Sequence, residues 1–357
     1  METKKIYFVW DYTQRDRDFW NEHFENWLPK EIIDAHLHIA KPEHRIRTQT
    51  EEMRHQYWVS EVNELITGEE LYNSDEFIFP GRKIKRVAFG TPTLDMDYDA
   101  NNDYIEEVAQ KYQWNGLVVL VPGWSQERVL KEISRPNILG VKPYYSMIGR
   151  DDSTRDRYLE ASIFEFLPHS TLEVLNDRHA WVTLHVPKAD RLGHPDNIRE
   201  IKEIRRRYPD ITLVIAHIGR CYSKEHATEG ILPLADDPGL YFDSSAVLNP
   251  ESHTIALKAL GPYRLLYGSD NPIFFMRGRR QIHGRKYVNR TNYPFFFNKE
   301  RESAEIEAQY TLMMYEDILS VKKACQATDN DNPEAIRAIF HDNAERLINR
   351  VLSYKNR

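Results

Sequence analysis

The chain has 357 residues, of which 41% are hydrophobic and 29% charged, a composition that predicts a soluble globular protein with ample material for a core. Its formal net charge of −7 argues against binding to nucleic acid or to an anionic membrane. No apolar stretch reaches the ~18–20 residues that a membrane span needs. The short apolar run near the amino terminus and the presence of only two cysteines favour a cytoplasmic location.

Eight short apolar segments rich in β-branched residues predict strands. They span residues 31–39, 84–90, 116–122, 138–144, 181–186, 211–218, 240–246 and 264–270. Helical periodicity occupies most of the gaps, at residues 103–112, 162–178, 196–208, 253–260 and 333–352. Eight strands that alternate with helices predict the α/β class and a (β/α)8 TIM barrel. An open doubly wound sheet is less favoured, because no glycine-rich nucleotide loop follows the first strand.

We expect residues 31–357 to form a single catalytic barrel domain. Residues 1–30 would be an N-terminal extension that covers the base or the side of the barrel. Two long segments, 41–80 and 271–300, interrupt the repeat as insertions after the first and the eighth strand. Both follow the carboxyl ends of strands, where barrel loops build active sites, so we expect them to determine substrate specificity.

Four histidines and one aspartate lie near the ends of predicted strands. His36 and His38 are two residues apart on the first strand, so they point to the same side. His185 and His217 lie near the ends of the fifth and sixth strands, and Asp270 ends the eighth. A lone histidine at a strand end is more often structural. Four histidines and an aspartate at one barrel rim instead predict a reactive centre. Imidazole nitrogens and a carboxylate are the ligands that an ion such as Zn²⁺ prefers.

The segment Asp34-Ala-His-Leu-His38 resembles the first-strand motif of the amidohydrolase superfamily. Later segments are similar to its amidohydrolase-related branch. That branch includes aminocarboxymuconate semialdehyde decarboxylase, resorcylate decarboxylases and the lactonase for pyrone dicarboxylate. The matching segments are 181–185, 208–219, 241–245, 266–272 and 342–347, and the resemblance covers residues 31–352.

The resemblance implies one divalent metal ion held by His36, His38, His185 and Asp270. The ion would be Zn²⁺ in the first place, with Mn²⁺ or another first-row ion as alternatives. His217 would act as the catalytic acid and base or orient the carbonyl group, and Asp270 would also accept a proton from the attacking water. The implied reaction is hydrolysis of an amide, a lactone or a similar carbonyl compound. Non-oxidative decarboxylation of an unsaturated or aromatic acid is the alternative, and a non-catalytic binding barrel is the third. Barrels of this kind often form homodimers.

Lys142 lies on the predicted fourth strand, and its role stays open. In two-metal amidohydrolases a lysine on this strand is carboxylated and bridges the two ions. His185 and His217 would then bind the second ion. The other options are contact with the substrate and a purely structural role.

A basic segment follows the last predicted strand. Residues 274–298 contain six arginines or lysines and no acidic residue, although the whole chain is acidic. Guanidinium groups suit the recognition of carboxylates, so we expect a small-molecule substrate with an acidic group. One or two of Arg277, Arg279 and Arg280 would bind that group, and the alternative is a solvated loop or a subunit contact. Comparable candidates for substrate binding are Tyr144, Arg150 and Arg220, which follow barrel strands, and Lys142 on the predicted fourth strand.

Overall fold

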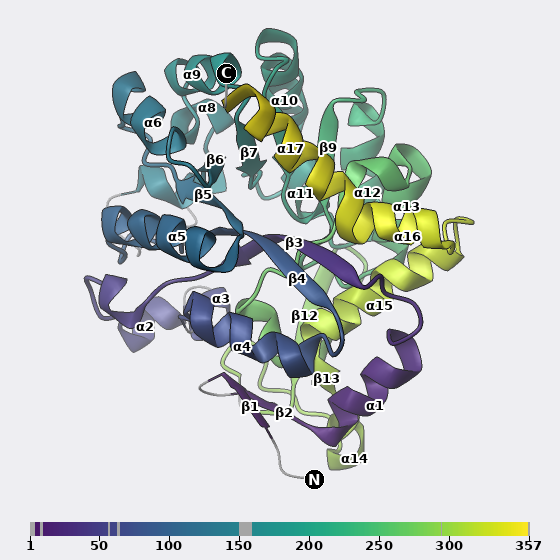
Figure 1. Ribbon diagram of the computed structural model, residues 1–357. Coiled ribbons are helices and arrows are strands. Elements are labelled where there is room, and N and C mark those ends of the chain that lie inside the picture. The colour runs from purple at the N-terminus through teal and green to yellow at the C-terminus, as the bar shows by residue number, and fades with distance from the viewer. Residues whose placement is uncertain are drawn as a thin grey trace.

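Eight parallel strands form one sheet in chain order (Figure 1). The computed structural model describes residues 4–7, 10–55, 58–62, 65–149, 159–293 and 295–355. The barrel strands are β3 (Glu31–His38), β4 (Lys83–Phe89), β5 (Asn115–Val119), β6 (Ile138–Lys142), β7 (Trp181–Leu184), β8 (Thr212–Ile215), β9 (Leu240–Asp243) and β10 (Leu265–Leu266). The predicted TIM barrel is confirmed, although several strands are shorter than their apolar segments.

Hydrogen bonds join β3 to the chain that follows β10 and bring the first and last strands together. The backbone N–H of Asp270 donates to the carbonyl oxygen of His36 over 2.7 Å. The carboxylate of Asp34 accepts from the backbone N–H of Ser269 at 2.9 Å and from its hydroxyl group at 2.5 Å. These contacts fix Asp270 next to the histidine pair of β3.

Helices cover the outside of the barrel and its amino end. They are α5 (Tyr98–Tyr112), α6 (Gln126–Ile133), α8 (Ile163–Phe166), α9 (His169–Asp177), α10 (Pro195–Arg207), α12 (Lys224–Ile231), α13 (Pro250–Leu260), α15 (Met313–Gln326), α16 (Pro333–Arg337) and α17 (Asn343–Lys355). The helix predicted over 162–178 is divided into α8 and α9, because Pro168 has no N–H with which to continue it. The last helix contacts β3, β6 and β10, and packs Leu347 and Val351 against residues of the strands, so it closes the amino end of the barrel (Figure 1).

The segment predicted as the first insertion is helical. It contains α2 (Glu51–Arg54), α3 (Trp58–Val62) and α4 (Gly68–Ile78). Thr67 caps α4 by accepting a hydrogen bond from the backbone N–H of Glu70. A Cβ atom at Gly68 would lie 2.5 Å from the side chain of Val108, so the glycine permits close packing of α4 on α5. The second half of this segment is therefore the helix that follows the first barrel strand.

The second insertion is a β-hairpin of β11 (Arg277–His283) and β12 (Lys286–Thr291), and β11 also pairs with β13 (Thr311–Leu312) after the short helix α14 (Ala304–Glu307). The N-terminal segment contains the antiparallel strands β1 (Lys4–Tyr7) and β2 (Trp10–Tyr12), followed by α1 (Gln14–His23). Phe19 and Trp20 of α1 pack against Tyr315 of α15, so this segment lies along the side of the barrel. Within the described part of the chain, no helix has both the length and the apolar character that crossing a bilayer requires.

Candidate metal centre

The two histidines of β3 and the aspartate that follows β10 meet at the carboxyl end of the barrel. Oδ1 of Asp270 lies 3.5 Å from Nε2 of His36 and 3.4 Å from Nε2 of His38. All three side chains are buried, and their ligand atoms are close enough together to bind one ion. The structure therefore brings together two imidazole nitrogens and a carboxylate, a donor set that suits a zinc-like ion.

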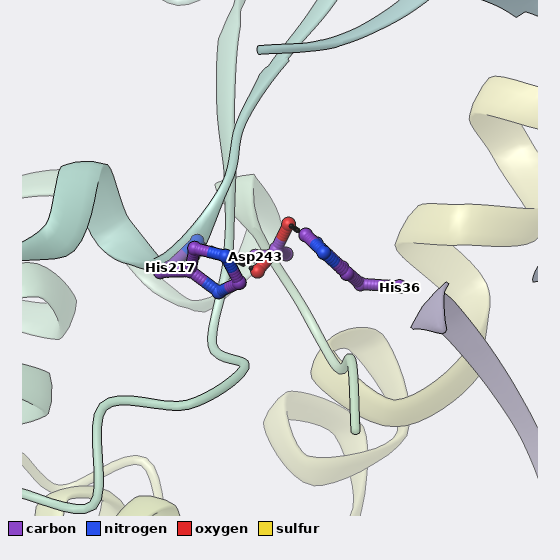
Figure 2. A group of neighbouring side chains, drawn as sticks. All are labelled: His36, His217 and Asp243. Atoms are coloured by element: carbon purple, nitrogen blue, oxygen red, sulfur yellow. Dashed lines mark hydrogen bonds and ion pairs between the residues drawn. The ribbon is translucent and has the colours of Figure 1, made fainter. Parts of the chain in front are cut away.

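The second nitrogen of each of these histidines already has a partner. Nδ1 of His36 lies 2.8 Å from Oδ2 of Asp243 (Figure 2). Nδ1 of His38 lies 3.0 Å from the carbonyl oxygen of Gly90. An ionised carboxylate and a carbonyl oxygen only accept hydrogen bonds, so each Nδ1 carries the proton. Each Nε2 therefore presents its lone pair toward Asp270, as in histidines that bind metals.

The charge states of these groups also suit a cation. Burial, together with the nearby charge of Lys142, lowers the pKa of His36 to about 3, so its imidazole is neutral at pH 7. Burial acts to raise the pKa of Asp270, but His217 and His38 outweigh it and hold the pKa at about 2. A neutral imidazole beside an ionised carboxylate is what metal binding requires, so His36 and Asp270 fit a divalent ion.

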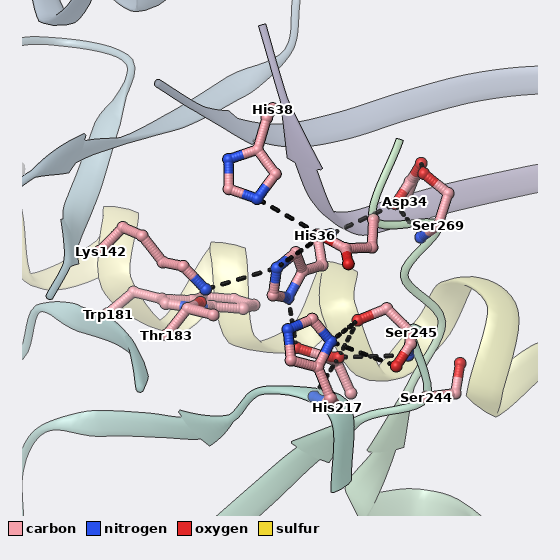
Figure 3. A network of polar contacts seen from close by, with 12 residues as sticks. Asp34, His36, His38, Lys142, Trp181, Thr183, His217, Ser244, Ser245 and Ser269 are labelled. Atoms are coloured by element: carbon pink, nitrogen blue, oxygen red, sulfur yellow. Dashed lines mark hydrogen bonds and ion pairs between the residues drawn. The ribbon is translucent and has the colours of Figure 1, made fainter. Parts of the chain in front are cut away.

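His217 follows β8 and begins the short helical segment α11 (His217–Arg220). Its Nδ1 lies 2.9 Å from the hydroxyl oxygen of Ser245 (Figure 3). This hydroxyl group in turn donates to Oδ1 of Asp243 over 2.5 Å. The ring centroid of His217 is 4.5 Å from that of His36. The φ angles of His217 and Asp270 are 55° and 54°, in the left-handed region that costs energy for residues other than glycine. Two predicted site residues thus have strained backbones that the surrounding hydrogen bonds hold in place.

Asp243, the last residue of β9, connects the two halves of the site. Its carboxylate accepts from His36 Nδ1, from the hydroxyl of Ser245, and from the backbone N–H of His217 at 2.9 Å. Burial acts to raise its pKa, but the electrostatic interaction with His36 and the hydrogen bonds from His36 and Ser245 outweigh this and hold the pKa well below its usual range. Asp243 was not among the site residues predicted from the sequence. The available signal was a carboxylate at the end of a buried strand, the same position that singled out Asp270.

Replacing Asp243 with alanine is expected to weaken metal binding by about 10- to 100-fold, because it removes the group that orients His36. Asp243→Asn keeps an acceptor for the Nδ1 proton and should lose less. Competition with a chromophoric chelator measures the affinity. Asp237→Ala, which removes a carboxylate paired with Arg205 at the amino end of β9, is the control and should leave the affinity unchanged. Equal affinities for all variants would show that Asp243 has no positioning role.

Lys142 is fully buried beside the histidines. Its Nζ lies 3.4 Å from Nε2 of His36 (Figure 3) and 4.8 Å from the ring centroid of Phe89. Burial lowers the pKa of the amine to about 8. This position suits either a bridge between two ions or contact with the substrate, and it does not suit a structural role remote from the site.

His185 follows β7 and lies on the His217 side of the site. Its ring centroid is 5.2 Å from that of His217 and 4.5 Å from that of Tyr144. Among the described residues, the close groups of ligand atoms at this rim are His36 with His38 and Asp270, and His36 with His217 and Asp243. The structure therefore places His185 and Tyr144 at the rim, but outside these two groups.

Two of the arginines predicted to bind substrate already have carboxylate partners. Arg277 donates to both carboxylate oxygens of Asp16, over 2.7 and 2.6 Å, and is buried. Arg279 forms an ion pair with Glu302. These contacts tie the hairpin to its surroundings, so Arg277 and Arg279 are poor candidates for binding an acidic substrate.

The remaining candidates differ in what surrounds them. The guanidinium of Arg280 donates to the carbonyl oxygen of Ala246, in the loop after β9, over 2.5 Å. Arg220 donates to the carbonyl oxygen of Lys188 over 2.9 Å. Arg150 lies outside the described residues. Of the three predicted arginines Arg277, Arg279 and Arg280, Arg280 is the one with a described hydrogen bond to the loop after β9, which carries Ser245.

A closed barrel that gathers histidines and an aspartate at its carboxyl rim defines a class of metal-dependent barrel enzymes. The chain belongs to the amidohydrolase family, because the family model Amidohydro_2 (amidohydrolase) matches residues 33–350. The resemblance inferred from the sequence is thereby confirmed. Members of this family are metal-dependent hydrolases or decarboxylases, so the chain is an enzyme, and the alternative of a non-catalytic barrel is not supported.

Solved structures of similar fold include several amidohydrolases. One is an amidohydrolase from Burkholderia multivorans with bound Zn, at 13% identity and a TM-score of 0.56, covering 89% of this chain and 99% of that one. A probable 2-pyrone-4,6-dicarboxylic acid hydrolase from Acinetobacter baumannii with bound citric acid has 14% identity, a TM-score of 0.53 and the same coverage. A 2,6-dihydroxybenzoate decarboxylase in complex with 2,6-dihydroxybenzoate has 11% identity and a TM-score of 0.51, covering 90% and 99%. At these identities the likeness shows the fold alone. A search of curated proteins finds no match.

Proposed function

We propose that the chain is a metal-dependent hydrolase that cleaves an amide, a lactone or a similar carbonyl group of a small molecule. His36, His38, His185 and Asp270 would hold one divalent ion, preferably Zn²⁺. The main support is that two Nε2 lone pairs and a carboxylate oxygen face one another, while both Nδ1 atoms are already bonded elsewhere. A divalent ion bound there would polarise the carbonyl group and activate water at neutral pH.

The protein groups that would move protons in this reaction are His217 and Asp270. Nδ1 of His217 is directed at the hydroxyl of Ser245, whose own proton goes to Asp243, so Nε2 of His217 is the basic nitrogen. Burial lowers the pKa of His217, which keeps this imidazole neutral and able to accept a proton. The ionised carboxylate of Asp270 is the second acceptor. His217 would then return its proton to the leaving group.

Non-oxidative decarboxylation of an unsaturated or aromatic acid is the second candidate. It is favoured by the structural similarity to a 2,6-dihydroxybenzoate decarboxylase. In that reaction a protonated His217 would give a proton to the carbon that loses CO₂. The products separate the two reactions, since hydrolysis adds water and decarboxylation releases CO₂.

Several further expectations accompany this proposal. Residues 31–357 would act as one catalytic unit, with residues 1–30 as an extension along its side. A homodimer and a cytoplasmic location stay predictions. Lys142 would contact the substrate in a one-metal site and would bridge the ions in a two-metal site.

The first test is the metal content of protein purified without added metal, measured by inductively coupled plasma mass spectrometry. We expect about one equivalent in the wild type and almost none in a His36→Ala/His38→Ala variant, because two ligands are lost. His194→Ala, which removes a half-buried histidine at the start of α10, is the control and should keep the metal. Two equivalents would instead assign Lys142 to a bridge. No metal after reconstitution would contradict the proposed mechanism.

A further inference from the structure

Arg280 is the hairpin arginine whose guanidinium keeps donors available for a ligand. Nε donates to Oδ1 of Asn289 over 2.9 Å and one terminal nitrogen donates to Ala246 O over 2.5 Å, which uses two of its five N–H donors. Within the described part of the chain, it forms no ion pair with a carboxylate. Arg277 and Arg279, in contrast, are neutralised by acidic residues. The buried carboxyl group of Asp317 interacts electrostatically with Arg280, but burial raises the pKa of Asp317 to about 8, so this group is mostly uncharged at pH 7. Arg280 is therefore a half-buried cation that forms no ion pair with a described carboxylate.

Aromatic rings from four segments surround this cation. The guanidinium carbon lies 4.2 Å from the ring centroid of Tyr287, 5.2 Å from that of Tyr222, 5.6 Å from that of Phe274 and 6.0 Å from that of Trp58. These rings displace water, and an ion pair is stronger in such surroundings than in bulk solvent. They also offer flat faces for an unsaturated or aromatic ligand.

A second guanidinium reinforces the positive charge. Arg191 lies 4.8 Å from the ring centroid of Tyr222, the ring that Arg280 also contacts. One of its terminal nitrogens lies 2.7 Å from Nδ1 of His226, a neutral acceptor. No described carboxylate forms an ion pair with Arg191. Two guanidinium groups around one tyrosine would favour an anion over a neutral ligand.

The hydrogen bonds of Arg280 connect it to the loop after β9, which carries Ser245, the hydrogen-bond partner of His217. Ala246, whose carbonyl oxygen it contacts, directly follows Ser245, the partner of His217. Asn289 is the residue opposite Arg280 in the β11–β12 pairing, so the guanidinium is held on a regular hairpin. A substrate group bound to Arg280 would thus be positioned by the same loop that orients His217.

We propose that Arg280 determines substrate specificity by binding a carboxylate of the substrate, while the surrounding rings hold a flat unsaturated or aromatic skeleton. The substrate class is then an unsaturated or aromatic organic acid. This inference rests on the proposed function, because it concerns the substrate of the same site. It adds to that proposal a residue from the hairpin, which lies outside the metal centre.

Two simple probes test the inference, benzoate and its uncharged counterpart benzamide. Their binding to the metal-loaded enzyme is measured by ligand-observed NMR titration for the wild type, Arg280→Gln and Arg279→Gln. We expect Arg280→Gln to weaken benzoate binding by at least about tenfold and to leave benzamide binding unchanged, because only benzoate loses a charged partner. Arg279→Gln is the matched control and should affect neither probe. Arg280→Lys keeps the charge without the planar fork and should give an intermediate loss.

Three results would overturn the inference. They are unchanged benzoate binding in Arg280→Gln, an equal loss of both probes, and a wild type that does not prefer benzoate to benzamide. An equal loss would mean that Arg280 only supports the pocket. Metal content and melting temperature are measured on the same samples, and Arg280→Gln should retain both. Selective loss of benzoate binding in a protein that holds no metal would refute the proposed function but not the role of Arg280.

Discussion

Replacing His217 with glutamine is expected to lower turnover by about 10²- to 10⁴-fold, the usual contribution of general acid–base catalysis. Glutamine keeps a polar side chain but cannot accept and return a proton. Nε2 of His36 and His38 and Oδ1 of Asp270 are left unchanged, so the metal content should also be unchanged. The measurement is kcat and kcat/KM on a substrate found by screening lactones, amides, esters and unsaturated acids.

The control for this variant is His169→Gln, which removes an imidazole bonded to the hydroxyl of Tyr208 on the outside of the barrel. Its kinetic constants should equal those of the wild type. If His217→Gln lost one of two bound ions, His217 would be a ligand of a second ion instead of an acid and base. Full activity in His217→Gln would exclude both roles.

The barrel and most of its rim could be predicted because both follow from local patterns. Alternation along a strand puts His36 and His38 on one side, and the parallel topology puts every strand end at one rim. Asp270 therefore meets these histidines without any need to know the packing in detail. The helix boundaries were less predictable, as Pro168 and the capped start of α4 show.

Asp243 and the partners of the arginines could not be predicted in the same way. His36 and Asp243 are 207 residues apart, and only the closed barrel brings them together. Residues 274–298 contain no acidic residue, yet Asp16 reaches Arg277 from 261 residues away. A count of charges within a window therefore overestimates how many cations are free to bind a ligand.

The position of the hairpin follows from the same long-range contact. Arg277 begins β11, and its guanidinium is anchored to α1 through Asp16. The hydroxyl of Thr311, in β13, also donates to Asp16 over 2.6 Å. The N-terminal extension thus supports the strand that carries Arg280, which connects the extension to the proposed specificity residue.

Replacing Asp16 with alanine is expected to lower the free energy of unfolding by about 3–5 kcal/mol, the usual cost of breaking a buried ion pair. The side chain of Asp16 is fully buried and that of Arg277 is 11% exposed, so alanine would leave a buried guanidinium without its anion. Urea unfolding followed by tryptophan fluorescence measures the change. The control is Glu229→Ala, which breaks the exposed pair with Arg285 and should cost no more than about 1 kcal/mol. Similar losses in both variants would contradict a special role for the buried pair.

The effect of Asp16→Ala should also depend on pH. Burial is the largest influence on the pKa of Asp16 and raises it, but the hydrogen bonds and charge of Arg277, with the hydroxyl of Thr311, outweigh it and lower the pKa below its usual range. A lowered pKa in the folded state stabilises the protein fully above the unfolded pKa of about 3.9, and this stabilisation is lost as the pH falls through the folded value. The difference between wild type and variant should therefore be constant from about pH 7 to pH 5 and shrink below about pH 4. A difference that stayed constant in acid would mean that packing, and not the ion pair, is the source of the stability.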